Sequence, residues 1–149
     1  MGWMTLKAVS ELGQEGMVVD SEARGFKLRA DEPTDLGGTD QGMNPVEMLL
    51  SALGSCQCMT VRFFAAMLKI ELTDCRVELE GDIDLMGFLS GDGAIRPGFQ
   101  RIRSVIHLRA RSGQEKLDEL MCLVEKRCPV SDTLTGGTVV ETRISVSAP

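Results

Sequence analysis

The chain has 149 residues, of which 43% are hydrophobic and 26% charged, an ordinary composition for a soluble protein that is long enough to bury a core. Its net charge of −6, with scattered lysines and arginines, argues against a nucleic-acid partner, because phosphate binding needs clustered basic residues. Five cysteines, an odd number, do not form the pattern of a secreted disulfide framework.

The N-terminal residues Met1 to Lys7 lack the design of a signal peptide, so a cytoplasmic location is the expectation. No internal repeat, low-complexity tract or linker interrupts the sequence. We therefore expect a single domain over residues 1–149.

Three short strands are expected at the beginning of the chain, over residues 3–10, 15–21 and 24–30. A loop rich in glycine, aspartate and proline follows over residues 31–43. This pattern predicts a small sheet that leads through a turn-rich connection into the first helix.

The first helix is predicted to start at Asn44, an N-cap residue that is followed by Pro45 and completed by Glu47 as a capping box. The following stretch is low in glycine and proline, so the helix should continue to about Ile70. Its apolar run, residues 48–61, is shorter than the ~20 residues of a membrane span. We expect a buried core helix and no membrane partner.

The remaining chain alternates between strand and helix patterns. Apolar and charged residues alternate over residues 75–80 and 101–109, which predicts two half-buried strands. A second helix is expected after Gly113, where apolar residues recur at helical spacing, and a closing strand over residues 140–146. The order β-β-β-α-β-β-α-β predicts an α+β fold with antiparallel sheets packed around two core helices.

Two cysteines stand in distinctive surroundings. Cys56 follows Ser-Ala-Leu-Gly-Ser and lies in the middle of the first helix. The chain from Leu117 to Cys128 turns by ~1100°, or about 20° net, so Cys128 lies on the apolar stripe of the second helix. Pro129 disfavours helical geometry at Cys128. We therefore expect a thiol pair, with Cys128 at a helix C-terminus and facing the core.

Three motifs occur in order: Gly-Gly-Thr-Asp-x-Gly-x-Asn-Pro at residues 37–45, Leu-Leu-Ser-Ala-Leu-Gly-Ser-Cys-x-x-Met-Thr at 49–60, and Cys-Pro-Val-Ser-x-Thr-Leu at 128–134. With this combination the chain resembles the OsmC/Ohr family of osmotically inducible and organic hydroperoxide resistance proteins, and within it the OsmC-like branch. The resemblance implies an intertwined homodimer with the active site at its interface. It also implies a thiol peroxidase, in which Cys56 attacks the peroxide, becomes a sulfenic acid and condenses with Cys128 to a disulfide.

The residues agree with this division of roles. A thiolate at a helix C-terminus faces the negative end of the helix dipole, so Cys128 should resist ionisation and suit the resolving role. A free thiol is only a few per cent ionised at neutral pH, so a reactive Cys56 needs a nearby cation.

The activating residues depart from the family pattern. The resemblance implies an upstream arginine held by a glutamate directly after the Asn-Pro motif, where this chain has Val46. Arg24, Arg29 and Glu47 are the activation candidates. Both arginines also fit as solvated strand residues. Glu47 also fits as a cap, because it lies nine residues before Cys56 and therefore on the opposite helix face.

The first helix is apolar almost all round, and such a helix must be buried on every side. One sheet and one other helix in so small a chain can hardly cover it. A homodimer that covers the remaining faces is the expected solution. The residues concerned are Leu49, Leu50, Ala52, Leu53, Cys56, Cys58, Met59, Val61, Phe63, Phe64 and Met67.

Two functions from different classes fit the sequence, neither with a cofactor or a metal site. The first is a cysteine-based peroxidase that reduces organic hydroperoxides with a thiol or dithiol reductant. The second is a non-catalytic dimer that binds a small hydrophobic ligand or senses oxidation, with Val46 marking a lost activating network. Cys58 lies ~200° around the helix from Cys56, so these two do not form a thioredoxin-like pair and are poorly placed to chelate a metal. Cys58, Cys75 and Cys122 are interpreted as small core residues rather than redox partners.

Overall fold

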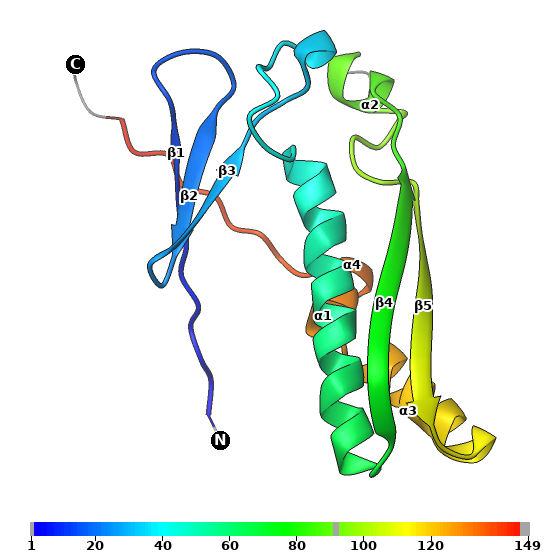
Figure 1. The fold of residues 1–149 in the computed structure, drawn as a ribbon. Coiled ribbons are helices and arrows are strands. Elements are labelled where there is room, and N and C mark those ends of the chain that lie inside the picture. Colours follow the sequence, from blue (N-terminus) through cyan, green and yellow to red (C-terminus); the bar gives the residue numbers. More distant parts are fainter. Residues whose placement is uncertain (1, 91–92, 147–149) are drawn as a thin grey trace. The chain divides into compact units, whose positions relative to one another are not determined.

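The computed structural model describes residues 2–90 and 93–146, and the chain divides into two compact units, residues 1–51 and 52–149. Figure 1 shows the elements of each unit. The first unit is a small sheet with the loop that follows it. The second contains most of the first helix, a long two-stranded sheet and the C-terminal helices.

The sheet of the first unit has the antiparallel order β1-β2-β3, with β1 at Val9–Leu12, β2 at Val19–Ala23 and β3 at Phe26–Ala30. Its second turn has two residues, Arg24 and Gly25, with φ of 54° and 85°. Positive φ at both positions matches the right-handed twist of a tight hairpin. The three predicted strands are therefore present, although the first starts later than expected, because residues 2–8 form no strand.

The loop after β3 is organised by a buried carboxylate. Asp31 is 1% exposed and accepts hydrogen bonds from the Thr39 hydroxyl at 2.6 Å and from the backbone N–H groups of Glu32, Thr39 and Gln41. These donors, the Thr39 hydroxyl foremost, lower the pKa of Asp31. Gly38 lies so close to Glu32 that an added Cβ would collide with its backbone, which explains one glycine of the 37–45 motif.

The second unit is built on a long hairpin. β4 (Glu71–Asp82) pairs antiparallel with β5 (Arg101–Arg111), and a register shift lies between Leu72 and Asp74. The helices are α1 (Pro45–Met67), which begins in the first unit, α2 (Met86–Leu89), α3 (Gln114–Arg127) and α4 (Pro129–Thr135). The antiparallel sheets and two long helices confirm the predicted α+β class.

The hydrophobic core of this unit lies on one face of the hairpin. Val61 and Ala65 of α1 are packed with Leu120 and Val124 of α3, and the apolar side chains of β4 and β5 cover them from the sheet side. Figure 1 shows α1 running alongside β4. At Gly54 the helix comes so close that an added Cβ would lie 2.7 Å from the Leu79 side chain.

The C-terminal residues differ from the prediction. Among the described residues 138–146 no strand is formed, and Val140, Ile144 and Val146 are at least 84% exposed. The expected closing strand is therefore wrong for the single chain, because a strand needs a neighbour for its hydrogen bonds and none is paired with this segment. The short helices α2 and α4 were also not predicted.

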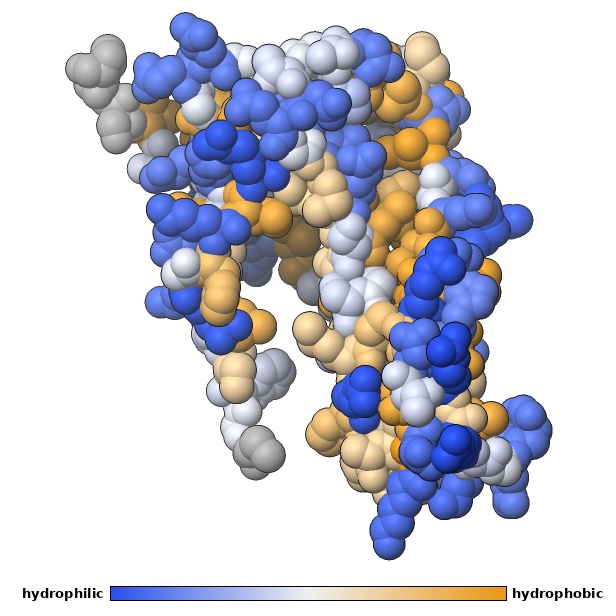
Figure 2. Space-filling model, in the orientation of Figure 1, coloured by the Kyte–Doolittle hydropathy of each residue, from blue (hydrophilic) through white to orange (hydrophobic). Residues whose placement is uncertain are grey.

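α1 is covered on one side only. Met59, Phe63 and Met67 are 72%, 62% and 63% exposed, and Figure 2 shows apolar side chains open to the surface along this helix. With 23 residues, α1 is long and apolar enough to cross a membrane by length and composition alone, a test that core helices of soluble proteins also pass. The expectation of burial on every side is thus not met within one chain.

Candidate active site

The capping box at the start of α1 determines where Cys56 lies on the helix. The Asn44 N–H donates to the Glu47 carboxylate at 3.0 Å, and the Glu47 N–H donates to the Asn44 side-chain oxygen at 2.9 Å. This pair satisfies two N–H groups that the first turn leaves without helical partners. The predicted cap is confirmed, and Cys56 lies well inside the helix.

Cys56 and Cys128 face each other directly. Their sulfurs are 3.2 Å apart, and the Cys128 S–H donates to the Cys56 Sγ. Cys56 is half-buried, whereas Cys128 is 1% exposed. A disulfide needs sulfurs about 2.05 Å apart, so a small side-chain rotation would join them.

The backbone explains the position of Cys128. This residue is extended, with φ −71° and ψ 111°, and it separates α3 from α4, which begins at Pro129. Its placement at the end of α3 and on the core side confirms the prediction. The following helix α4 was missed, because the proline that ends α3 also begins α4.

Burial raises the pKa of the Cys128 thiol, and the neighbouring Cys56 raises it further. The backbone N–H groups of Ser131 and Val130, at the start of α4, act in the opposite direction. The predicted resistance to ionisation is therefore supported, but its main cause is burial rather than the dipole of α3. A Cys128 that keeps its proton suits a resolving thiol.

Cys56 opens onto an apolar hollow of about 680 Å³. Thr60, one helical turn later, is not free for chemistry, because its hydroxyl donates to the Cys56 carbonyl at 2.7 Å. The side chains around the sulfur are mostly hydrophobic, which suits an apolar molecule. The hollow is lined by Ala52, Ser55, Cys56, Met59, Thr60, Phe63, Phe64, Arg127 and Pro129.

Arg127 is the charged residue of this lining, and it stands in the last turn of α3 directly before Cys128. Arg127 was not predicted from the sequence, because the family pattern places the activating arginine upstream of the helix. Its position beside Cys128 in the sequence was the signal that would have found it. Within the described part of residues 52–149, no arginine donates a hydrogen bond to the Cys56 sulfur.

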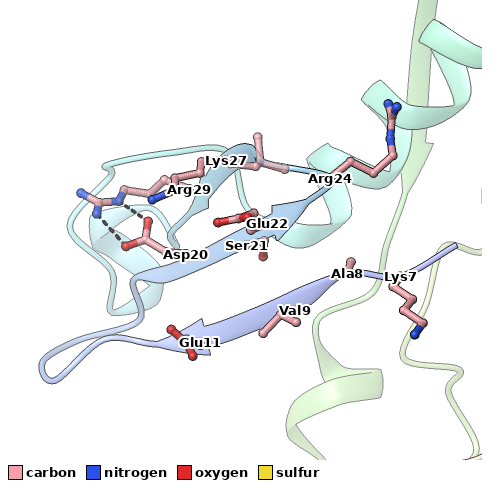
Figure 3. Close-up of a pocket in the computed structure, with 11 residues that line it drawn as sticks. Lys7, Ala8, Val9, Glu11, Asp20, Ser21, Glu22, Arg24, Lys27 and Arg29 are labelled. Carbon is pink, nitrogen blue, oxygen red and sulfur yellow. Dashed lines mark hydrogen bonds and ion pairs between the residues drawn. The ribbon is translucent and has the colours of Figure 1, made fainter.

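The two upstream arginines belong to the first unit. Arg29 forms a double hydrogen bond with Asp20, with both distances 2.8 Å, and the guanidinium of Arg24 lies 5.5 Å from the Phe26 ring centre. Both line a hollow of about 830 Å³ beside the sheet, and Figure 3 shows the Arg29 guanidinium turned toward Asp20. This hollow contains no cysteine, so we assign the chemistry to the hollow at Cys56.

The three other cysteines differ in their burial. Cys58 and Cys75 are half-buried and Cys122 is exposed, so the interpretation of Cys122 as a core residue is wrong. Among the residues that the structure describes, no group of three or more His, Cys, Asp or Glu side chains could hold a metal ion.

Comparison with known proteins decides the family. The sequence model of the OsmC-like proteins matches residues 38–143, more than half of the chain, and this region includes both Cys56 and Cys128. The chain belongs to the OsmC-like family. A hydroperoxide reductase from Mycoplasma genitalium is 27% identical over 107 residues, which cover 72% of each chain.

Solved structures of this family have the same fold. An OsmC-like protein from Mycoplasma pneumoniae superimposes with a TM-score of 0.76 at 19% identity, over 89% of each chain. An organic hydroperoxide resistance protein OsmC from Legionella pneumophila gives a TM-score of 0.63 at 22% identity, over 91% of this chain and 93% of that one. The predicted OsmC-like fold is therefore confirmed.

Proposed function

We propose that this OsmC-like protein is a thiol-dependent peroxidase that reduces organic hydroperoxides, with Cys56 as the reactive and Cys128 as the resolving cysteine. Family membership and the hydroperoxide reductase relative support a function in hydroperoxide defence. The observation that carries the cysteine roles is the 3.2 Å approach of the two sulfurs, in which Cys128 donates its proton toward Cys56.

The proposed reaction has two steps. The Cys56 thiolate attacks the terminal oxygen of the hydroperoxide, the O–O bond breaks, and an alcohol leaves while the sulfur is oxidised to a sulfenic acid. The Cys128 sulfur then attacks the Cys56 sulfur, and the hydroxyl group leaves with the Cys128 proton as water. A thiol or dithiol reductant returns the disulfide to two thiols.

The apolar hollow supports an organic substrate rather than hydrogen peroxide alone. Met59, Phe63 and Phe64 line it next to Cys56, and an apolar tail would remove their exposed surface from water. Arg127 is the charged residue that lines this hollow. We propose that it favours the thiolate of Cys56 and the negative charge that develops on the leaving oxygen. Arg24, Arg29 and Glu47 stay as the further activation candidates.

We also propose that the protein works as a homodimer in the cytoplasm. The exposed apolar side of α1 and the unpaired residues 138–146 are surfaces that a second copy would cover. The family match covers residues 38–143, and the superposition on the Mycoplasma pneumoniae structure covers 89% of the chain, which supports one OsmC-like domain over residues 1–149.

A second candidate function is a non-catalytic dimer that binds a small hydrophobic ligand or senses oxidation. Val46, in place of the family glutamate, favours it, and so does the finding that no arginine of the described residues 52–90 and 93–146 donates a hydrogen bond to Cys56. The same hollow of about 680 Å³ would hold the ligand.

One assay separates the two functions. Purified protein is mixed with cumene hydroperoxide and dithiothreitol, and the loss of hydroperoxide is followed over many equivalents. Catalytic turnover that disappears in Cys56→Ser and persists in the matched control Cys122→Ser supports the peroxidase. Absence of turnover in the wild-type protein, together with displacement of an apolar fluorescent probe by cumyl alcohol, supports the ligand-binding function.

A further inference from the structure

A second pair of cysteines meets on the other side of α1. The Cys75 S–H on β4 donates to the Cys58 Sγ on α1, with 3.9 Å between the sulfurs. Cys58 follows Cys56 by two residues, so the two sulfurs leave the helix in directions ~200° apart. The helix thus carries one member of each pair, and Cys128 and Cys75 supply the other members from separate elements.

We propose that Cys58 and Cys75 form a second redox pair, which hydroperoxide oxidises to a disulfide that cross-links α1 to β4. The proposal rests on the proposed function only for the oxidant. The contact between the sulfurs stands independently of it.

The hydrogen bond between the two sulfurs has the same direction in both pairs. In each, the cysteine of α1 accepts the hydrogen bond and its partner donates it. Burial raises the pKa of Cys75 to about 11, and its contact with Cys58 adds to this. Cys75 is therefore the poorer nucleophile of its pair and keeps its proton at neutral pH. Cys58, which does not donate in this contact, is therefore assigned as the cysteine that attacks the hydroperoxide.

The chemistry balances with one hydroperoxide. The Cys58 thiolate attacks the terminal peroxide oxygen, the O–O bond breaks, and the alcohol leaves, so that Cys58 becomes a sulfenic acid. The Cys75 sulfur then attacks the Cys58 sulfur, an S–S bond forms, the S–O bond breaks, and water leaves with the Cys75 proton. The sulfurs must approach by about 2 Å, which side-chain rotation and small shifts of a half-buried contact can supply.

The cross-link would also have a structural consequence. Cys75 packs against the core cluster of α1 and α3. A disulfide there would tie the middle of α1 to the long hairpin and close the chain between residues 58 and 75, which stabilises a fold by restricting the unfolded chain. The pair would therefore take up oxidant and at the same time make the oxidised second unit more resistant to unfolding.

The test uses the double variant Cys56→Ser/Cys128→Ser, which removes the first pair. It is treated with equimolar cumene hydroperoxide, blocked with iodoacetamide, digested with trypsin without reduction and analysed by mass spectrometry. Trypsin cleavage after Arg29, Arg62, Lys69 and Arg76 places Cys58 in peptide 30–62 and Cys75 in peptide 70–76. A species of these two peptides joined, two hydrogens lighter than their sum, supports the proposal, as does a raised Tm that falls again on reduction.

Two matched variants control the assignment. Adding Cys75→Ser should abolish the joined species, whereas adding Cys122→Ser should leave it unchanged. Recovery of peptides 30–62 and 70–76 separately, each carrying the iodoacetamide label after peroxide, would overturn the proposal, as would linkage of Cys58 to Cys122 instead. Should the double variant not fold, the wild-type digest is used, and fragmentation of the joined species should place the link at Cys58, because peptide 30–62 then contains both Cys56 and Cys58. Wild-type turnover through Cys56 is measured separately, so failure of the proposed function is distinguished.

Discussion

The thiol of Cys128 donates to the sulfur of Cys56 across 3.2 Å, although the two residues are 72 positions apart in the chain. The contact exists because α3 ends with an extended residue that points to the core, directly beside the middle of α1. The two sulfurs therefore differ in their surroundings: the Cys56 sulfur is half-buried at the hollow, and the Cys128 sulfur is fully buried.

This difference predicts different defects for the two serine variants. Cys56→Ser should abolish hydroperoxide reduction at the hollow, where Cys56 is the thiol of the described lining, and leave only the oxidation proposed for Cys58 and Cys75. Cys128→Ser should reduce one equivalent and then stop with Cys56 as a sulfenic acid, which dimedone labels. Single-turnover kinetics with dimedone labelling would check both. Hydroperoxide turnover by Cys56→Ser at the wild-type rate would contradict the assignment.

Arg127 should contribute to the rate through its charge. We expect Arg127→Met to lower kcat/KM by roughly tenfold or more, since each ~1.4 kcal/mol of lost charge stabilisation is a factor of ten. Arg127→Lys should retain part of the rate because the charge remains. Steady-state assays with cumene hydroperoxide measure these values. If Arg127→Met keeps full activity while Arg24→Met or Arg29→Met loses it, the activating cation belongs to the first unit instead.

The dimer predicts opposite outcomes at two neighbouring residues. Phe63 is 62% exposed, whereas Phe64 packs on the core, and the two rings make an edge-to-face contact at 5.2 Å. Phe63→Glu should dissociate the dimer, because each apolar side chain buried there contributes roughly 1.5 to 3 kcal/mol. Phe64→Glu should unfold the chain, since it places a charge against the core.

Light scattering and circular dichroism distinguish these outcomes. The wild-type protein should scatter as a dimer, and Phe63→Glu should give a smaller species that retains some secondary structure. A well-folded wild-type monomer of 16.2 kDa at micromolar concentration would contradict the dimer.

Asp31 should make the free energy of unfolding depend on pH in the acid range. Its pKa is lowered in the folded protein, chiefly by the Thr39 hydroxyl and also by the backbone N–H groups of Gln41, Thr39 and Glu32. Its stabilising effect is therefore complete above the unfolded pKa of about 3.9 and is lost as pH falls through the lower folded value. Asp31→Asn should lower the Tm at pH 7 and flatten this acid dependence, while exposed Asp35→Asn changes neither. If the Tm of Asp31→Asn depends on pH in the same way as that of the wild-type protein, this stabilising role of Asp31 is refuted.

Local patterns predicted much of this fold. The cap at Asn44, the strands β2 to β5 and the apolar stripe that carries Cys128 each depend on neighbouring residues, and the structure contains all of them. The family motifs added the pairing of Cys56 with Cys128. The alternation at Val140 to Val146 did not produce a strand, since strand formation requires a partner that local sequence does not specify.

The features that were missed depend on how distant elements meet. Arg127 lines the hollow because α3 ends beside the middle of α1. The presence of an arginine at this position does not by itself indicate that the two helices meet there. The contact of Cys58 with Cys75 depends on the turn at residues 68–70, which brings β4 back along the helix. Neither follows from periodicity.

The most direct test of the peroxidase is the disulfide itself. Wild-type protein treated with one equivalent of cumene hydroperoxide is blocked with iodoacetamide and digested with trypsin without reduction. We predict a species of peptide 30–62 joined to peptide 128–143, with one hydroperoxide consumed per link. Peptide 30–62 contains both Cys56 and Cys58, so fragmentation of the joined species should place the link between Cys56 and Cys128. Unconsumed hydroperoxide, with both cysteines recovered as labelled free thiols, would contradict it.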